Sequence, residues 1–176
     1  MGRIAAIGIF LAGAVLLAGA ASGADDGDHQ PLFVNYGTDA SIRQGDNDHH
    51  QAIYLSVPAD TPGPLYVRLF DPDTTNYHDQ MDRRSSTTRT RFSVFGGPGA
   101  FIERPTDPER LTEAELTSGT RLAERTFGSS RRDGDNAWVT LAELDPADGE
   151  KAGDRIIFRL VVDAVSGVNG NVYDVA

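Results

Sequence analysis

The sequence predicts an all-β fold: an antiparallel β-sandwich, jelly-roll-like, of about eight strands with one short inserted helix. Two observations support this prediction. Short segments alternate apolar and polar residues with a period of two, and turns rich in glycine, proline, aspartate and asparagine separate them. Only one segment carries helix signals. Antiparallel sheets with one apolar face bury that face on each other, so two packed sheets are expected.

The first half of the chain contains four of the predicted strands. They lie at residues 32–36, 52–57, 65–70 and 90–95. The first is closed by Gly37, and the second places Ile53 and Leu55 on one face. The third ends at the Asp-Pro-Asp run around Pro72, because proline cannot donate to a strand ladder. The fourth stops at the glycine-rich turn 96–99.

The second half contains the helix and the other strands. The helix is predicted within residues 107–118, where Thr112 and Glu115 have the spacing of a capping box. The later strands are predicted at residues 121–127, 137–144, 155–164 and 171–175. The strand at 155–164 has the clearest pattern, because Ile156 and Phe158 begin a long apolar face.

The N-terminus has the order of a cleavable signal peptide. Arg3 gives a basic start, residues 4–17 are apolar or glycine, and residues 18–24 are small. The apolar run is shorter than the roughly 20 residues of a membrane span, so no stable span is expected after cleavage. We therefore expect residues 1–24 to be a signal peptide and residues 25–176 to be a single domain. The protein would be exported: periplasmic, on the outer surface or secreted.

The charge balance narrows the possible partners. The chain has 26 acidic and 16 basic residues and a formal net charge of −10. A negative surface repels nucleic acid and anionic membranes, whereas it suits divalent cations and neutral sugars. The chain contains no cysteine, which excludes disulfides, thiolate metal sites and cysteine nucleophiles. An exported domain without disulfides relies on its core or on a bound ion.

Acidic and amide residues follow several predicted strands and offer the oxygen ligands that calcium prefers. The predicted metal ligands are Asp71, Asp73, Asp79, Asp163, Asn169 and Asn171. Asp71 and Asp73 leave one strand, Asp163 closes another, and the Asp-Gly-Asp-Asn segment 133–136 offers the same chemistry. Calcium would relieve the repulsion between these carboxylates if the strand ends are neighbours. The alternative is a set of ordinary turn formers, since no segment has the ligand spacing of an EF-hand.

Other catalytic or metal chemistry has weaker sequence support. His49 and His50 could bind zinc or copper, but neighbouring strand residues point to opposite faces. His78 with Ser85 or Ser86 could serve a hydrolase, yet the chain has no Gly-x-Ser-x-Gly elbow. Facing carboxyl pairs for glycoside cleavage are too numerous in an acidic chain to single out. We therefore expect no enzymatic activity.

The aromatic residues allow two interpretations. Tyr66 and Phe70 flank Arg68 on one strand face, and Trp138 lies on another strand. An exposed aromatic platform would stack on sugar rings, whereas buried aromatics would build the core. The sequence favours core positions for Trp138 and Phe158.

Several segments together resemble a known module. Residues 66–74, 90–97, 138–140, 158–163 and 170–173 are similar to an N-terminal β-sandwich module of exported, OmpA-type envelope proteins of Gram-negative bacteria. The resemblance implies a non-catalytic exported module. The peptidoglycan-binding domain that follows in those proteins is not in this chain, so the resemblance does not extend to anchoring on the cell wall.

Three function hypotheses follow. The first is an exported, non-enzymatic, calcium-stabilised sandwich for cell-surface interaction or adhesion, with a surface protein or glycan as partner. The second is a carbohydrate-binding module, and the third is a small secreted hydrolase. Converging carboxylates at one end of the sandwich would favour the first. A concave face with exposed aromatics would favour the second, and a Ser–His or carboxylate pair in a pocket the third.

Overall fold

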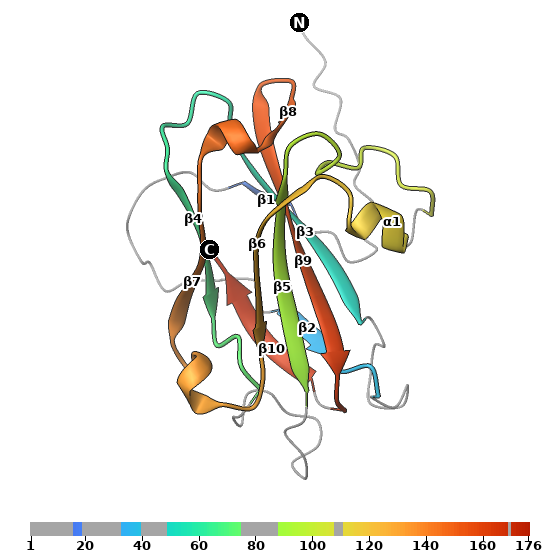
Figure 1. The fold of residues 1–176 in the computed structure, drawn as a ribbon. Helices are drawn as coiled ribbons and strands as arrows, with labels where there is room; N and C mark the ends of the chain where they lie inside the picture. The colour runs from blue at the N-terminus through green and yellow to red at the C-terminus, as the bar shows by residue number, and fades with distance from the viewer. Residues whose placement is uncertain (1–15, 19–32, 40–48, 75–87, 108–110, 169) are drawn as a thin grey trace, which may run out of the picture.

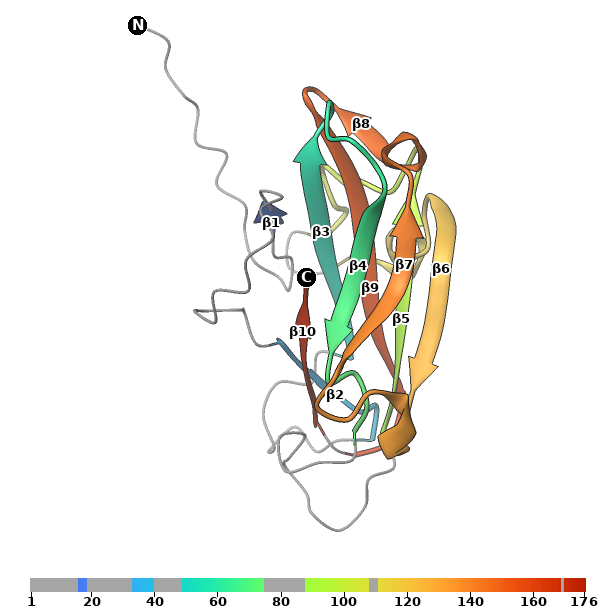
Figure 2. The ribbon, with the colours of Figure 1, turned by 90° about the vertical axis from the view of Figure 1, so that its left-hand side faces the viewer.

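A computed structural model describes residues 16–18, 33–39, 49–74, 88–107, 111–168 and 170–176. They form a β-sandwich of two sheets, seen face-on in Figure 1 and edge-on in Figure 2. The order of neighbouring strands in the large sheet is β1 (Leu16–Ala18), β3 (His50–Pro58), β9 (Arg155–Ser166), β5 (Arg89–Gly96) and β6 (Thr120–Phe127). A further short strand, β8 (Glu150–Ala152), pairs with β9. The small sheet runs β2 (Phe33–Tyr36), β10 (Gly170–Val175), β4 (Leu65–Phe70), β7 (Trp138–Leu144). Every pair is antiparallel except β1 with β3.

The predicted all-β sandwich is therefore confirmed, and each of the eight predicted strands is present within a few residues. The short strands β1 and β8 were not predicted, and β1 lies within the predicted signal peptide, residues 1–24. The predicted short helix is present as α1 (Glu113–Leu116). Its capping box is present, with Glu115 N–H donating to the Thr112 hydroxyl and Thr112 N–H donating to the Glu115 carboxylate. Two short 3-10 turns, η2 (Arg131–Asp133) and η3 (Pro146–Asp148), precede β7 and β8.

The core lies between the two sheets and follows the period-two pattern. Phe158 and Leu160 of β9 are buried against Leu69 of β4 and Tyr173 of β10. Phe158 is thus a core residue, as predicted. The prediction for Trp138 is wrong, because this residue lies outside the core cluster and is only half-buried.

Trp138 packs on the outer side of the small sheet. Its ring centroid lies 5.4 Å from that of Phe70, its partner in the β4–β7 register. The guanidinium of Arg68 lies 5.0 Å from the centre of the Trp138 ring. Period-two alternation explains this position, since Val139 and Leu141 take the inner face.

Part of the outer face of the large sheet is covered by the segment between β5 and β6, which carries α1 and is called the cover segment below. Ala100 and Leu116 of this segment pack on Phe95 and Val161 of the sheet. This segment lies beside the upper part of the large sheet in Figure 1. Arg159 of β9 is completely buried beneath it. None of the helices among the described residues has the length and hydropathy to cross a membrane.

Candidate cation site and outer-face groove

Three aspartates meet at one end of the sandwich, where β4 ends and the turn before β7 lies. One carboxylate oxygen from each of Asp71, Asp73 and Asp135 lies within 4.8 Å of the other two. Asp71 and Asp73 are buried, and Asp135 is half-buried. Carboxylates at this spacing repel one another, and a cation would relieve the repulsion while taking their oxygens as ligands. The cluster can therefore hold a metal ion.

The register of the small sheet brings the three aspartates together. Phe70 pairs with Trp138, so the residues that leave β4 run beside those that enter β7. The backbone N–H of Asp71 donates to the carbonyl of Ala137 at 3.2 Å. In return, the N–H of Asn136 donates to Oδ1 of Asp71 at 2.8 Å. Two hydrogen bonds of Asp71, one through its backbone and one through its side chain, therefore hold the two chain segments together.

Three residues with a positive φ shape this end of the sandwich. Asp71 and Asn136 each have a φ of 52°, and Gly134 has a φ of 122°. A Cβ on Gly134 would lie 2.7 Å from Cγ2 of Val139 and 3.0 Å from Cδ of Pro72. Only glycine fits there, and the close approach lets the turn that carries Asp135 lie against the Asp-Pro-Asp run.

Asn171 of β10 reaches the same place. Its Nδ2 donates to the carbonyl of Pro72 at 3.1 Å, and the residue is completely buried. Its Oδ1 has no hydrogen-bond partner among the described residues. A fully buried amide oxygen thus lies next to the segment that joins Asp71 and Asp73, which adds to the oxygen-rich character of this end.

Of the other predicted metal ligands that the structure describes, Asp163 does not join the cluster. Asp163 lies on the outer face of the large sheet, where Arg91 and His50 contact its carboxylate. Asp163 therefore cannot bind the same ion as Asp71 and Asp73. Asp79 and Asn169 lie outside the described residues. Asp135 was part of an acidic segment noted in the sequence, but it was not among the predicted ligands.

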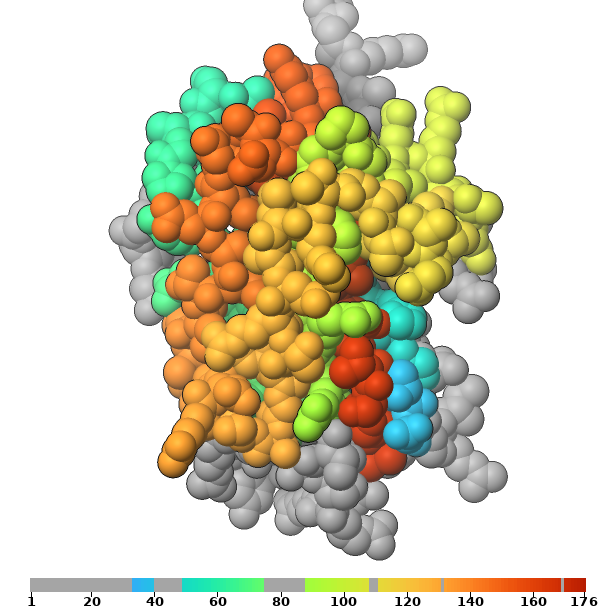
Figure 3. Space-filling model, in the orientation of Figure 1, coloured from blue at the N-terminus to red at the C-terminus, as the bar shows by residue number. Residues whose placement is uncertain are grey.

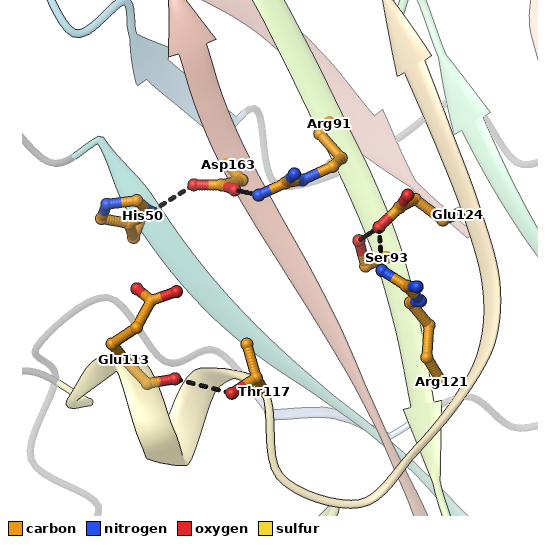
Figure 4. A network of polar contacts seen from close by, with 8 residues as sticks. All are labelled: His50, Arg91, Ser93, Glu113, Thr117, Arg121, Glu124 and Asp163. Carbon is orange, nitrogen blue, oxygen red and sulfur yellow. Dashed lines mark hydrogen bonds and ion pairs between the residues drawn. The ribbon is translucent and has the colours of Figure 1, made fainter.

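A groove of about 200 Å³ opens on the outer face of the large sheet, beside the cover segment. In Figure 3 the yellow α1 segment covers the upper part of this face, and β9, in red, is visible below it. Phe95, Leu116 and Val161 form the apolar part of the groove lining. The remaining lining residues are polar or charged, and Figure 4 shows how they are connected.

At one end of the groove three neighbouring strands each supply a charged or titratable side chain. Asp163 of β9 is paired in register with His50 of β3 on one side and Arg91 of β5 on the other. Both partners contact its carboxylate, as Figure 4 shows. His49 points elsewhere, with its Nδ1 3.1 Å from the carbonyl of Tyr36. The two histidines therefore do not share the zinc or copper site considered from the sequence.

A second polar network lies further along the groove. Glu124 of β6 accepts hydrogen bonds from Arg121 at 2.7 Å and from the Ser93 hydroxyl at 3.2 Å. On the helix side, Glu113 and Thr117 complete the wall. This groove was not predicted from the sequence. Its signal was the charge of Arg91 and Asp163 at outward positions of two strands with apolar inner faces.

The contacts of Asp163 shift two pKa values. The hydrogen bond with Asp163 raises the pKa of His50 above its ordinary value of 6.5, against the opposing effect of burial. Burial alone would raise the pKa of Asp163, but the contacts with His50 and Arg91 outweigh it and lower that pKa below 3.8. The pair therefore favours a protonated imidazole beside an ionised carboxylate.

This pair gives a pH-dependent stability difference. Because the pKa of His50 is raised on folding, its stabilising effect is complete below pH 6.5 and is lost as the pH rises through the folded-state pKa. We expect His50→Gln to lower the free energy of unfolding at pH 5.5 and to have little effect at pH 9. The loss should stay below about 1 kcal/mol, since the side chain of His50 is 48% exposed. Urea unfolding at both pH values measures it.

A double-mutant cycle with Asp163→Asn provides the control. The coupling energy between His50 and Asp163 should be favourable at pH 5.5 and close to zero at pH 9. A His50→Gln loss that is the same at both pH values would contradict a charged interaction and indicate a packing effect.

The groove does not have the arrangement of a serine hydrolase. His50 and Asp163 resemble two members of a triad, but the Ser93 hydroxyl bonds to Glu124. Ser93 and His50 lie on β5 and β3, on either side of β9, which separates their backbones by about 10 Å. The hydrolase candidates His78, Ser85 and Ser86 lie outside the described residues.

Comparison with known proteins provides no relative for this site. No family model matches the chain, and neither a characterised protein nor a solved structure does.

Proposed function

We propose that this chain is an exported, non-enzymatic β-sandwich module, stabilised by calcium, that serves in interaction or adhesion at the cell surface. The cluster of Asp71, Asp73 and Asp135 is the observation that carries the proposal. Its donors are all carboxylate oxygens, with the amide oxygen of Asn171 nearby. Hard oxygen donors suit calcium or magnesium, and calcium tolerates an irregular shell better than magnesium does.

Three further features support the other parts of the proposal. Residues 1–24 have the composition of a signal peptide, which favours export into a compartment where calcium is abundant. The Ser93 hydroxyl is bonded to Glu124, away from the imidazole of His50, which favours a binding role over hydrolysis. The negative net charge of the chain favours a cation as ligand and disfavours nucleic acid as partner.

Calcium is expected to raise the melting temperature of the purified protein. Extracellular calcium modules bind with a Kd of about 0.1–1 mM. At a hundredfold excess over Kd, binding adds about 2.7 kcal/mol to the free energy of unfolding. For a domain of this size the melting temperature should rise by roughly 5–10 °C. Magnesium should have a smaller effect, since it requires a tighter octahedral shell.

The double variant Asp71→Asn, Asp73→Asn should remove the calcium response and leave the domain folded. The matched control is Asp60→Asn with Asp154→Asn, which changes the charge equally at exposed turns at the opposite end of the sandwich. The control should keep the full response. If calcium shifts the melt no more than magnesium or sodium chloride does, the effect is charge screening and the proposed site does not exist.

A further inference from the structure

We propose that the groove on the outer face of the large sheet binds one ring of a neutral saccharide, free or as part of a glycan. This inference rests on the proposed function as a surface-interaction module, because it names the ligand class for that interaction. It places the binding surface on β3, β9, β5, β6 and α1. The cation cluster lies elsewhere, at the end of β4.

The charges of the groove favour a neutral ligand. Two arginines, Arg91 and Arg121, oppose three carboxylates, Asp163, Glu113 and Glu124. The groove therefore has a formal charge near −1, or near zero when His50 is protonated. Because the opposite charges nearly cancel, the groove offers little net electrostatic attraction to offset the cost of desolvating a charged ligand. A neutral ligand with many hydroxyl groups has no such desolvation cost and can use both kinds of charged group as hydrogen-bond partners.

The polar groups are held in place before a ligand arrives. Asp163 is fixed between Arg91 and His50, and Glu124 between Arg121 and Ser93. Each carboxylate has further lone pairs and each guanidinium further N–H groups, so both can still bond to ligand hydroxyls. Such bonds are charge-assisted, and fixed side chains lose little rotamer entropy on binding. Figure 4 shows both networks on the neighbouring strands, and both line the groove.

The size and the apolar part of the groove fit a sugar ring. A volume of about 200 Å³ is below the roughly 300–1,000 Å³ of pockets for drug-sized ligands, so one ring is the appropriate scale. Phe95, Leu116 and Val161 line the groove but are each only 6–7% exposed, so they give the ring a small apolar patch beside the polar groups. On the small sheet, Arg68 covers a face of Trp138 and Phe70 packs beside it, whereas Tyr66 is exposed.

The test is a titration followed by amide NMR shifts. The probes are the methyl glycosides of glucose, galactose, mannose and N-acetylglucosamine, with glucosamine and glucuronate as charged comparators. At least one neutral glycoside should shift the amides of Ser93, Phe95, Thr117 and Val161, with a Kd on the order of millimolar. Glucosamine and glucuronate should shift them less.

A charge-neutral double variant tests the residues. Arg121→Gln with Glu124→Gln should weaken binding of that glycoside by about tenfold or more, since it removes charged hydrogen-bond partners. The matched control, Lys151→Gln with Glu143→Gln, changes the same charges at exposed positions away from the groove and should bind as the parent does.

Three results would overturn the inference. They are no groove shifts with any neutral glycoside up to roughly 50 mM, stronger shifts with a charged comparator, or shifts confined to Tyr66 and Trp138. The variant Asp71→Asn, Asp73→Asn separates the two proposals. It should lose the calcium response and keep the glycoside shifts, so either proposal can fail without the other.

Discussion

Substituting Arg159 with methionine should lower the free energy of unfolding by about 3 kcal/mol and the melting temperature by roughly 6–12 °C. The guanidinium of Arg159 donates to the carbonyls of Ala100, Leu116 and Ser118 at 2.9, 3.2 and 2.6 Å. Burial lowers its pKa, which reflects the cost of placing this cation beneath the cover segment. Methionine fills similar space but leaves buried carbonyls without a donor.

The matched control for this prediction is Arg155→Met on the same strand and the same face. Arg155 donates to the hydroxyl and the carbonyl of Ser56 and is only partly buried, so its loss should cost about 1 kcal/mol. Hydrogen exchange gives a second readout. In the Arg159 variant the amides of residues 97–119 should lose protection before those of β9 do. Equal losses in the two variants would contradict the role assigned to Arg159.

Substituting Tyr173 with alanine should destabilise the domain by about 3–5 kcal/mol. Tyr173 belongs to the small sheet, but its completely buried ring packs edge-to-face on Phe92 of the large sheet, with 5.0 Å between centroids. It also stacks on Phe33 at 5.6 Å. Its removal leaves a cavity between the sheets, which the surrounding strands can fill only in part. Chemical unfolding with a two-state fit measures the loss.

Tyr173→Phe separates the ring from the hydroxyl group. The hydroxyl donates to the side-chain oxygen of Gln51 at 2.7 Å, and this hydrogen bond connects the small sheet to the large sheet. Its removal should cost about 1 kcal/mol, because one partly buried acceptor loses its donor. If the phenylalanine variant is as unstable as the alanine variant, the hydrogen bond dominates over the packing, contrary to our expectation.

The strands could be predicted because their pattern is local. Ile53 and Leu55, or Phe158 and Leu160, alternate with outward residues whatever the rest of the chain does. The same alternation puts Trp138 on the face opposite Val139 and Leu141, but it does not say which of these two faces points into the core. That choice depends on how the two sheets pack, which is not local information.

The cation cluster was predictable in part for the same reason. Asp71 and Asp73 leave a strand whose end is marked by Pro72, so their position at a sandwich end follows from the sequence. Asp163 was placed at the end of a strand, but β9 continues to Ser166. The aspartate therefore stays within the sheet, on the face opposite Val162, and meets Arg91 and His50.

The burial of Arg159 could not be predicted from the local sequence either. An arginine at an outward position of an amphipathic strand is normally solvated. Here a segment from a different part of the chain, residues 97–119, covers it and supplies the carbonyls that it binds. The contact between a buried cation and the segment that covers it is a tertiary feature. The spacing of residues around position 159 carries no signal for it.

The strand order has a consequence for how the chain reaches its native state. β9 and β10, which come after all the other described strands along the chain, occupy interior positions in their sheets, between β3 and β5 and between β2 and β4. Even Ala176 exchanges backbone hydrogen bonds with Arg68. A chain still emerging from the ribosome lacks the central strand of both layers, and the long-range pairings that depend on it form slowly. The large sheet can therefore not be completed before β9 has been synthesised, nor the small sheet before β10.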